Sequence, residues 1–277
     1  MTGLISNIQR CSLTDGPGLR TTVFMQGCSL RCFWCHNPET ISLKPQLMHN
    51  KDKCIGCLSC PLNVNECPAK ALTVSGKEMS AREVFAEVVK DMPFYGKDGG
   101  VTFSGGEPLV QVGFLAELLR LCKAHGINTA VDTAGCVPWA NIEAVMDLTD
   151  IFLYDIKAID PNLHKSGTER NNRMILKNLD RILQAGKNII IRIPVIPGFN
   201  DGRELERIKT YAEGKKIIHK NLIDIELLPY HDLGVVKYER RIGDDKYAQQ
   251  LPYLCRHPRV GDTRRKNPHR AAIYQPK

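Results

Sequence analysis

Three cysteines lie close together near the start of the chain, within the run GCSLRCFWCHNP over residues 27–38. Their C-x3-C-x2-C spacing places the thiols of Cys28, Cys32 and Cys35 on one short loop, where they can bind three irons of a four-iron cubane cluster. The fourth iron then has no protein ligand, so a reactant can bind there. Zinc is the alternative, but a structural zinc site needs four ligands, and His36, directly after a cysteine, is poorly placed to close a tetrahedron. The spacing therefore favours an open iron–sulfur cluster.

A second group of cysteines lies between residues 48 and 78, with the pattern C-x2-C-x2-C-x6-C-P. Bacterial ferredoxins have the run C-x2-C-x2-C-x3-C-P, so the last gap is longer here. Four thiolates are enough for one closed four-iron cluster, which carries electrons rather than binding a substrate. A zinc knuckle is the alternative, because thiolates serve both metals. The predicted ligands are Cys54, Cys57, Cys60 and Cys67.

The elements that must position these sites alternate along the chain. Short runs of Val, Ile, Leu and Phe alternate with amphipathic stretches, which is typical of buried parallel strands connected by helices. The predicted strands cover residues 21–26, 101–104, 129–132, 151–156, 189–196 and 223–228. The predicted helices cover residues 81–91, 114–125, 142–147, 175–185 and 204–211. The pattern predicts an α/β fold, and six units are too few for a complete eight-stranded barrel.

Local signals set the ends of three of these helices. Ser80 precedes the first helix and Glu83 follows three residues later, which is the pattern of a capping box. Gly126 and Gly186 follow the second and fourth helices, where glycine commonly ends a helix.

Polar residues and glycines follow the predicted strands, at the edge where parallel barrels place their active sites. The glycine pair after the second strand lets the backbone approach a ligand closely. Asp155 and Lys157 are two residues apart, so they face one side of their strand with Ile156 opposite; a buried ion pair is the alternative reading of the two charges. The candidates at these strand ends are Gly105, Gly106, Glu107, Asp132, Thr133, Asp155, Ile156, Lys157, Arg192 and His231.

Seven short motifs occur in a specific order. They are DGPGLR at 15–20, CHNPE at 35–39, GVTFSGGEP at 100–108, DTAG at 132–135, DIK at 155–157, RIPVIPG at 192–198 and LPYH at 228–231. In this order, over residues 4–240, the chain resembles the radical S-adenosylmethionine (SAM) superfamily, and within it the activating enzymes of glycyl radical enzymes. The resemblance implies a partial (β/α)6 TIM-type barrel with a small ferredoxin-like iron–sulfur insert.

The resemblance also implies a reaction and its participants. SAM binds the open iron, one electron cleaves its sulfonium C–S bond, and the 5′-deoxyadenosyl radical takes a hydrogen atom from a backbone glycine of a partner protein. The implied partner is a glycyl radical enzyme of the formate C-acetyltransferase type, with flavodoxin or ferredoxin as electron donor, under anaerobic conditions. Two alternatives are a radical SAM enzyme that acts on a small molecule and a non-catalytic iron–sulfur electron carrier.

The same resemblance assigns roles to the candidate residues. The Gly106 region and Asp132 are implied near the SAM amino group and Lys157 near its carboxylate. Asp155 is implied near the ribose, and either aspartate near a monovalent cation. The implied catalytic residues are Cys28, Cys32, Cys35, Asp15 and Lys157. The implied cofactor-binding residues are Trp34, Cys35, His36, Gly105, Gly106, Glu107, Asp132, Thr133, Asp155, Ile156, Lys157, Arg192 and His231. The residues expected to line the mouth that admits the partner's peptide are Asp15, Arg20 and His231.

Length, charge and hydropathy limit the domain organisation, the kinds of partner and the cellular location. The 277 residues suit one large domain with an insert: a barrel over residues 1–47 and 79–240, the insert over 48–78, and a divergent basic tail over 241–277. The end of the tail carries most of the net charge of +8 but lacks interleaved aromatics and periodicity, so we expect a solvated, disordered end and no nucleic-acid partner. Residues 1–10 lack a signal-peptide core, and no apolar run approaches the ~18 residues of a membrane span, so we expect a cytoplasmic protein with reduced thiols and no membrane partner.

Overall fold

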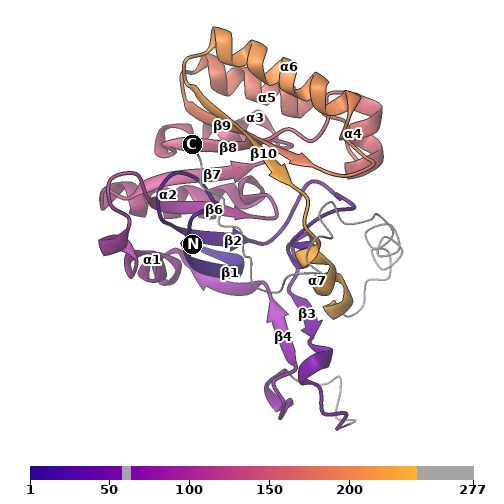
Figure 1. Cartoon of the computed structure of the whole chain (residues 1–277). Coiled ribbons are helices and arrows are strands. Elements are labelled where there is room, and N and C mark those ends of the chain that lie inside the picture. Colours follow the sequence, from indigo (N-terminus) through magenta and orange to yellow (C-terminus); the bar gives the residue numbers. More distant parts are fainter. Residues whose placement is uncertain (58–63, 242–277) are drawn as a thin grey trace, which may run out of the picture.

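The computed structural model describes residues 1–57 and 64–241 of the chain (Figure 1). Its main sheet is built from β1 (Thr2–Ser12), β2 (Arg20–Met25), β5 (Lys77–Ser80), β6 (Gly100–Gly105), β7 (Asn128–Thr133), β8 (Ile151–Asp155), β9 (Asn188–Val195) and β10 (Leu222–Pro229). The strands are hydrogen-bonded in the order β10-β9-β8-β7-β6-β2-β1-β5. β2 and the strands from β6 to β10 are parallel, whereas β1 and β5 pair antiparallel.

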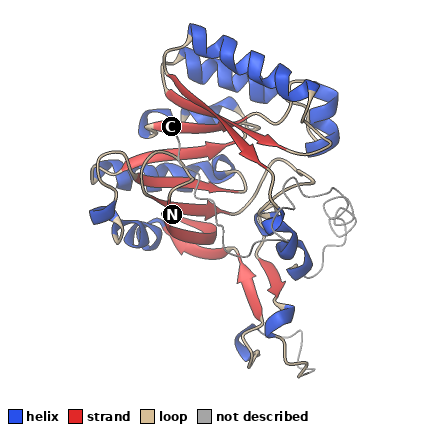
Figure 2. Cartoon of the chain, in the orientation of Figure 1, coloured by secondary structure: helices blue, strands red, loops and turns tan. Residues whose placement is uncertain are grey.

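The six parallel strands are the six predicted from the sequence, and the predicted α/β fold with a partial TIM-type barrel is confirmed. The sheet ends at β5 on one side and at β10 on the other, with most helices on its outer side (Figure 2). Val23, Phe103, Phe152 and Ile191 of four parallel strands are fully buried in one continuous core. β2 and the strands from β6 to β9 are mostly buried on both faces and are rich in apolar residues, whereas β10 is buried only at Leu222.

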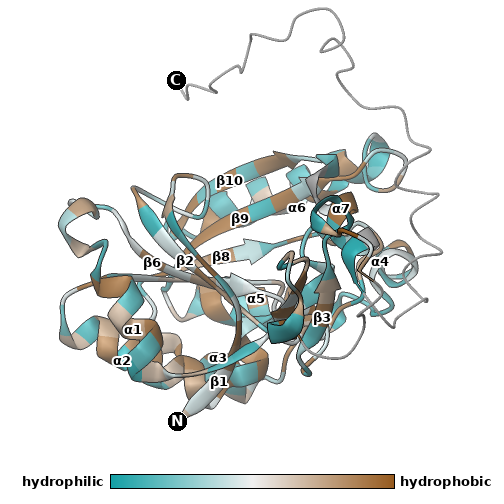
Figure 3. Cartoon of the chain, turned by 90° about the horizontal axis from the view of Figure 1, so that it is seen from below, coloured by the Kyte–Doolittle hydropathy of each residue, from teal (hydrophilic) through white to brown (hydrophobic). Residues whose placement is uncertain are grey.

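The α-helices are α1 (Ala81–Val89), α2 (Val112–Ala124), α3 (Trp139–Glu143), α4 (Pro161–Thr168), α5 (Arg173–Gln184), α6 (Arg203–Ile218) and α7 (Val235–Arg240). The predicted capping box begins α1: Ser80 N donates to Glu83 Oε2 (2.7 Å) and Glu83 N donates to Ser80 Oγ (3.3 Å). Gly126 and Gly186, with φ of +68° and +74°, follow α2 and α5 as predicted. α1 and α2 alternate hydrophobic and hydrophilic residues along their length (Figure 3), as expected for helices packed on a sheet.

Several elements differ from the sequence prediction, which also lacked α4, α7, β5 and the two strands of the insert. The helix predicted over residues 142–147 is wrong in extent, because α3 ends at Glu143 and a separate 3-10 turn follows. α6 continues to Ile218, beyond the predicted end. β1 was missed because it buries few of its residues and therefore lacks an apolar run. None of the helices in the described ranges is long and apolar enough to cross a membrane.

The insert begins as a two-stranded hairpin in which β3 (Gln46–His49) pairs antiparallel with β4 (Leu72–Ser75). The predicted ligands Cys54, Cys57 and Cys67 lie between these strands. The fourth, Cys60, lies outside the described residues, as does the tail from residue 242 onward. The 3-10 turns of the described chain are Pro38–Thr40, Lys51–Lys53, Val64–Glu66, Met92–Phe94, Pro108–Gln111, Met146–Leu148 and Asp232–Gly234.

Candidate active site

The cysteine loop, residues 28–35, follows β2 and lies at the C-terminal edge of the parallel strands. At its start, Cys28 N donates a hydrogen bond to Ile41 O (3.0 Å). In its middle, Arg31 N donates to Thr168 O (3.0 Å), the last residue of α4. The loop is therefore held on both sides, by the segment that follows it and by the helix after β8.

The three thiols of the loop lie in a buried environment. Burial raises the pKa of Cys32 to about 12 and that of Cys35 to about 11, and it raises the pKa of Cys28 further still. Neighbouring thiolates contribute to the shift of Cys28, so these sulfurs lie near one another. Iron binding would displace their protons, since the metal binds thiolates. Within the described chain no three Cys, His, Asp or Glu side chains converge on a single ion; a cubane does not require this, because each thiolate binds its own iron.

Aromatic side chains pack under the cysteine loop. Phe33 N donates to Gly167 O (3.1 Å), and the ring centroids of Phe33 and Trp34 are 4.7 Å apart. Trp34 also packs at 4.7 Å from Phe199 and is 5% exposed. The indole of Trp34 is therefore occupied by protein neighbours, which leaves only the backbone of this predicted cofactor-binding residue for a ligand.

The glycine pair brings the loop after β6 against the cysteine loop. Gly106 N donates to Met25 O (2.9 Å) and Glu107 N donates to Gly27 O (2.7 Å). A Cβ on Gly106 would lie 2.3 Å from Gly27 O, and Gly105 has a φ of +115°, so both positions require glycine. Since both N–H groups are used within the protein, this loop can offer a ligand only its carbonyl oxygens.

The side chain of Glu107 is directed into the protein. Its carboxylate accepts hydrogen bonds from Thr133 Oγ1 (2.7 Å), Ala134 N (3.1 Å) and Leu109 N (3.4 Å), and the residue is 1% exposed. Burial raises its pKa to about 7, and the three hydrogen bonds oppose this shift. Glu107 and Thr133 therefore connect the ends of β6 and β7, and this connection fixes the position of the neighbouring backbone.

The predicted pair at the end of β8 forms a buried ion pair. Lys157 Nζ lies 2.6 Å from Asp155 Oδ2, and the Lys157 side chain is 9% exposed. Ile156 points the other way, into the main core. Burial alone would lower the pKa of Lys157, but Asp155 and the other nearby anions outweigh it and hold that pKa above its usual range. One of these anions is the thiolate form of Cys32, so this ammonium lies beside the cysteine loop.

A second charged group joins β7 and β9. Asp132 Oδ2 accepts a hydrogen bond from Ser104 Oγ (2.7 Å) and lies 3.4 Å from Arg192 Nη1. Arg192 Nε lies 3.8 Å from Glu226 Oε2 of β10. Burial raises the pKa of Asp132 to about 6, although Arg192 opposes the shift. Four strands thus direct charged or polar side chains to one enclosed space.

Histidines and α7 cover the other end of the cysteine loop. The rings of His36 and His231 stack with centroids 3.9 Å apart. Burial, assisted by the neighbouring imidazole, lowers the pKa of His36 to about 4, so its ring is neutral at neutral pH. Lys237 Nζ of α7 donates to Asn37 Oδ1 (2.5 Å) and Glu39 Oε1 (3.0 Å), which fixes the segment that follows the loop.

Asp15 lies on the inner side of β2. Its Oδ2 accepts hydrogen bonds from Ser12 Oγ (2.6 Å) and Thr22 Oγ1 (2.7 Å), and its carbonyl accepts one from Thr102 Oγ1 (2.6 Å). The loop that carries Asp15 is therefore folded against the inner side of the strands.

The expectation that Arg20 lines the barrel mouth is wrong. Arg20 opens β2 and so lies at the N-terminal edge of the parallel strands, opposite the cysteine loop, where it is completely buried. Its guanidinium donates to Thr102 Oγ1 (2.6 Å), Pro17 O (3.1 Å) and Val101 O (2.7 Å). Burial lowers its pKa to about 10. Arg20 therefore connects the Asp15 loop to β6 through hydrogen bonds inside the protein.

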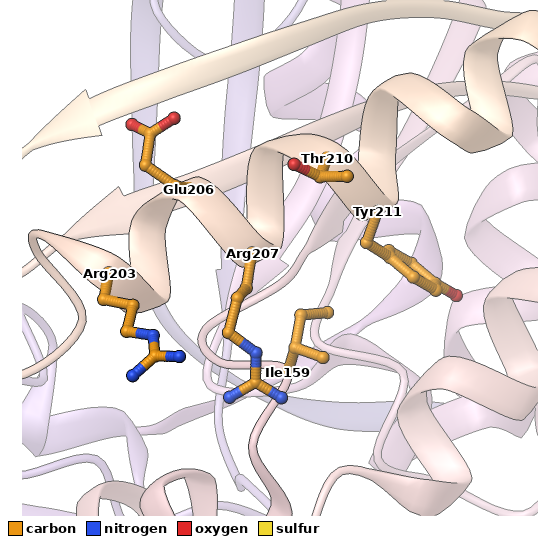
Figure 4. A pocket seen from close by; sticks show the side chains of 6 residues that line it. All are labelled: Ile159, Arg203, Glu206, Arg207, Thr210 and Tyr211. Atoms are coloured by element: carbon orange, nitrogen blue, oxygen red, sulfur yellow. The ribbon is translucent and has the colours of Figure 1, made fainter.

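A depression of about 430 Å³ on the outer helix layer is unrelated to this site (Figure 4). Its lining residues are Ile159, Arg203, Glu206, Arg207, Thr210 and Tyr211. None of them is a predicted site residue.

Comparisons with known proteins agree with this geometry. Residues 22–211 match the Radical SAM superfamily. The chain belongs to this superfamily. It is 38% identical over 271 residues to the trans-4-hydroxy-L-proline dehydratase activating enzyme of Clostridioides difficile, covering 87% of this chain and 88% of that protein. It is 37% identical over 249 residues to the pyruvate formate-lyase 2-activating enzyme of Escherichia coli (strain K12), covering 90% and 84%.

The fold comparison points the same way. Streptococcus suis SuiB, in its structure with the precursor peptide SuiA, is 12% identical with a TM-score of 0.53 and covers 82% of this chain and 43% of SuiB. That likeness shows a shared fold alone. The resemblance seen in the motifs is thus confirmed, and the radical SAM family uses a four-iron cluster and SAM, for which the three thiols and the enclosed charges are suited.

Sequence reasoning missed three residues that support the radical SAM site. Ser104 lies directly before the glycine pair and hydrogen-bonds Asp132, and its position in the motif was an available signal. Asn200 is fully buried and donates to Lys157 O (2.8 Å), which fixes that residue's backbone. Lys237 has no local signal, because its partners lie about 200 positions earlier in the chain.

Proposed function

We propose that this radical SAM chain activates a partner glycyl radical enzyme by removing one hydrogen atom from a backbone glycine. The observation that carries the proposal is that three loop thiols lie at the same strand edge as the enclosed charges of β7, β8 and β9. Cys28, Cys32 and Cys35 would hold the cluster, which when bound supplies the electron that splits SAM into methionine and a 5′-deoxyadenosyl radical. The glycine hydrogen leaves in 5′-deoxyadenosine, and the partner keeps the radical.

The enclosed charges suit the amino-acid part of SAM. Lys157 would hold its carboxylate, and Asp132 together with the carbonyls of the glycine-pair loop would accept from its amino group. Asp155 would lie near the ribose or near a monovalent cation. The support is electrostatic: the Lys157 ammonium is buried and the two carboxylates are partly buried, so charge interactions among them are stronger than in water.

The remaining predicted contacts extend this arrangement. The backbone of Trp34 and His36 would border adenine, and Arg192 and His231 would contact SAM or the peptide of the partner. For Glu107, Thr133 and Ile156, whose side chains are engaged within the protein, the proposed contribution is to hold the backbone of the site in place.

The decisive experiment uses cluster-reconstituted protein under anaerobic conditions. With dithionite and SAM we expect 5′-deoxyadenosine, and with a peptide that spans the radical-site glycine we expect a glycyl radical detectable by electron paramagnetic resonance. Formation of 5′-deoxyadenosine without a radical on any glycyl radical enzyme would instead favour a small-molecule substrate. No 5′-deoxyadenosine at all would favour an electron carrier.

The partner is proposed to be of the formate C-acetyltransferase type. The chain is also 36–38% identical to five activating enzymes that are named for dehydratases, a decarboxylase and lyases. This is about the same identity as to the pyruvate formate-lyase 2-activating enzyme. Peptides from the radical-site loops of several glycyl radical enzymes should therefore be compared, with the fastest radical formation identifying the partner class.

Asp15 is proposed to face the peptide of the partner. Asp15→Ala should reduce peptide turnover more than uncoupled SAM cleavage, because the loop touches the inner side of the barrel rather than the cysteine loop. Asp15→Asn, which keeps one acceptor oxygen, serves as the milder comparison. An equal loss of both activities would assign the residue to SAM binding or to the fold.

The insert is proposed to hold a second, closed four-iron cluster. Backbone N–H groups of residues 69–72 point to the sulfur of Cys67 and lower its pKa, with Leu72 contributing most, which is a suitable environment for a metal-bound thiolate. Anaerobic reconstitution should give about eight irons per chain. About four irons with one zinc would assign zinc to the insert.

Electrons are proposed to come from flavodoxin or ferredoxin, and the protein is proposed to act in an anaerobic cytoplasm. The support is the set of free cysteines in the described residues, since a reducing compartment keeps thiols available for iron.

A further inference from the structure

A group of cations borders the outer side of the cysteine loop, where the proposed reaction does not use them. Arg170, Arg173 and Lys177 are exposed, and Arg31 is partly exposed. Unlike Lys215, which pairs with Asp180 at 2.6 Å, none of the four has a carboxylate partner within the described ranges. We call Arg31, Arg170, Arg173, Lys177 and the neighbouring Met174 the α5 basic face.

This face is physically continuous with the cysteine loop. The Arg31 guanidinium donates to Cys28 O (2.7 Å) and Leu30 O (2.8 Å), directly on the loop. The carbonyl of Arg170 is held near α4 by Thr168 Oγ1 (3.0 Å), and Thr168 is also the acceptor of the Arg31 backbone.

Electrostatics gives a second link between the face and the loop. The charge of Arg170 and the nearby Ser29 of the loop both lower the pKa of Cys136, although burial raises it overall. The guanidinium of Arg170 therefore lies close enough to the loop for its charge to be felt there.

The cations are placed where they do not help the fold. Arg173 begins α5, whose first turn has no acidic residue, and a cation at a helix N-terminus opposes the helix dipole. Met174 beside it is 46% exposed, although methionine is usually buried. The one carboxylate adjacent in the chain is Glu169, which ends α4 with a φ of +63°. A surface with unpaired charge and exposed apolar area is typical of a transient interface.

We propose that the α5 basic face is the docking site of the electron donor, an acidic, low-potential one-electron carrier protein. This inference rests on the proposed function, because that reaction needs one electron per turnover. The carrier is oxidised by one electron and the oxidised cluster is reduced by one, with no bond made or broken. Opposite charge steers such weak, short-lived complexes and mainly accelerates association.

The position of the face argues for the carrier rather than for the glycyl radical enzyme. α4 and α5 connect β8 to β9, in the continuous part of the sheet, whereas the sheet is open between its end strands β5 and β10. A peptide that enters the barrel would use the open side, whereas α4 and α5 lie on the helix-covered side (Figure 1).

The test compares two charge-reversal variants with the same change in net charge. Arg173→Glu/Lys177→Glu alters the face, and Lys97→Glu/Lys220→Glu alters exposed lysines at the N-terminal edge of the strands. The probe is a purified acidic flavodoxin. We expect the face variant to bind it about tenfold more weakly at low salt, with and without reconstituted clusters, and to be reduced by flavodoxin hydroquinone about tenfold more slowly; charge steering of this kind changes association rates by 10-fold or more. The control variant should match the unmodified protein, and both should be reduced normally by dithionite.

Each other outcome overturns the proposal. Equal weakening in both variants would mean that net charge, not this face, binds the carrier. Unchanged binding by the face variant, or by the neutral Arg173→Gln/Lys177→Gln variant, would place docking elsewhere. If the face variant is reduced normally but forms less glycyl radical with dithionite, the face binds the radical enzyme. Failure of the proposed function itself would appear separately, as absence of 5′-deoxyadenosine from the unmodified protein with dithionite.

Discussion

The thiols of the cysteine loop and those of the insert have opposite surroundings. The loop is held between β2 and α4, and burial raises the pKa of Cys32 to about 12. The insert is a two-stranded extension that projects from the body of the protein (Figure 1). There Cys57 is exposed, and backbone N–H groups lower the pKa of Cys67.

This difference separates two uses of the same ligand chemistry. A buried loop protects a reactive centre from water, and it keeps its thiols protonated until iron displaces the protons. An exposed site with stabilised thiolates accepts metal readily. The comparison therefore predicts that loss of a cysteine from the loop abolishes SAM cleavage, whereas loss of a cysteine from the insert leaves part of that activity.

The largest effect is expected from removing one cysteine at each site. Cys32→Ala should abolish 5′-deoxyadenosine formation, because the reacting cluster loses a ligand. Cys67→Ala should retain part of the cleavage when dithionite supplies the electrons. Product is quantified by chromatography under anaerobic conditions, and circular dichroism checks folding. Equal and complete loss in two folded variants would break the division of roles.

Alkylation of the metal-free protein should distinguish the two groups of thiols. At pH 7.5 we expect Cys67 to react with iodoacetamide about a hundredfold faster than Cys32 and Cys35, because only thiolates react and the loop pKa values are about 11 to 12. Peptide mass spectrometry over time gives the individual rates. Similar rates at all three cysteines would show that the loop is open without its metal.

Glycine substitutions test how tightly each site is packed. Gly106→Ala should lose most of the iron of the loop, about half of the total, since its Cβ would meet Gly27 O at 2.3 Å. Gly56→Ala, in the insert, has no atom within 4 Å of its Cβ, and its φ of +67° should cost only about 1 kcal/mol. Iron content and thermal unfolding measure the two effects. Loss of iron from Gly56→Ala but not from Gly106→Ala would show that the insert, and not the loop, is the more tightly packed site.

The smallest effect concerns pH at the buried edge beside the loop. Glu107 has a folded pKa of about 7, raised from 4.5 by burial, so its stabilising contribution is complete below pH 4.5 and is lost as the pH rises through 7. We expect the unmodified metal-free protein to lose up to about 3 kcal/mol more than Glu107→Gln between pH 5 and pH 8. Urea unfolding at both values measures this. Glu213→Gln, an exposed substitution, should follow the unmodified protein, and an identical pH response in Glu107→Gln would remove Glu107 as the cause.

The site could be predicted from the sequence where its residues are close together in the chain. The period of two along a strand placed Asp155 and Lys157 together, and the ion pair at 2.6 Å confirms that they share a face. Most of the parallel strands were predictable because burial on both faces makes them rich in apolar residues, whereas β10 is mostly exposed or half-buried and was found from its apolar residues alone. The roles assigned to individual residues toward SAM and the partner stay predictions.

Contacts between distant segments could not be predicted. Arg20 belongs to a recognisable motif, but its burial depends on carbonyl groups of neighbouring strands that meet only in the fold. The indole of Trp34 is covered by Phe199, and no local pattern links the two. β1 resembles a surface segment because most of its side chains remain at least partly exposed. For Cys60 and the tail, the structure adds no description.

The support of the cysteine loop also constrains how the protein is made. Residues 28–35 leave the ribosome early, yet α4, Phe199 and Lys237 complete their surroundings, and Lys237 lies 200 positions after its partner Asn37. Since chains are synthesised from the N-terminus at about 5–20 residues per second, the cysteines wait on the order of ten seconds or more for their cover. The surroundings of the loop are therefore complete only after synthesis of the barrel, and during that interval the thiols are open to oxygen and to competing metals.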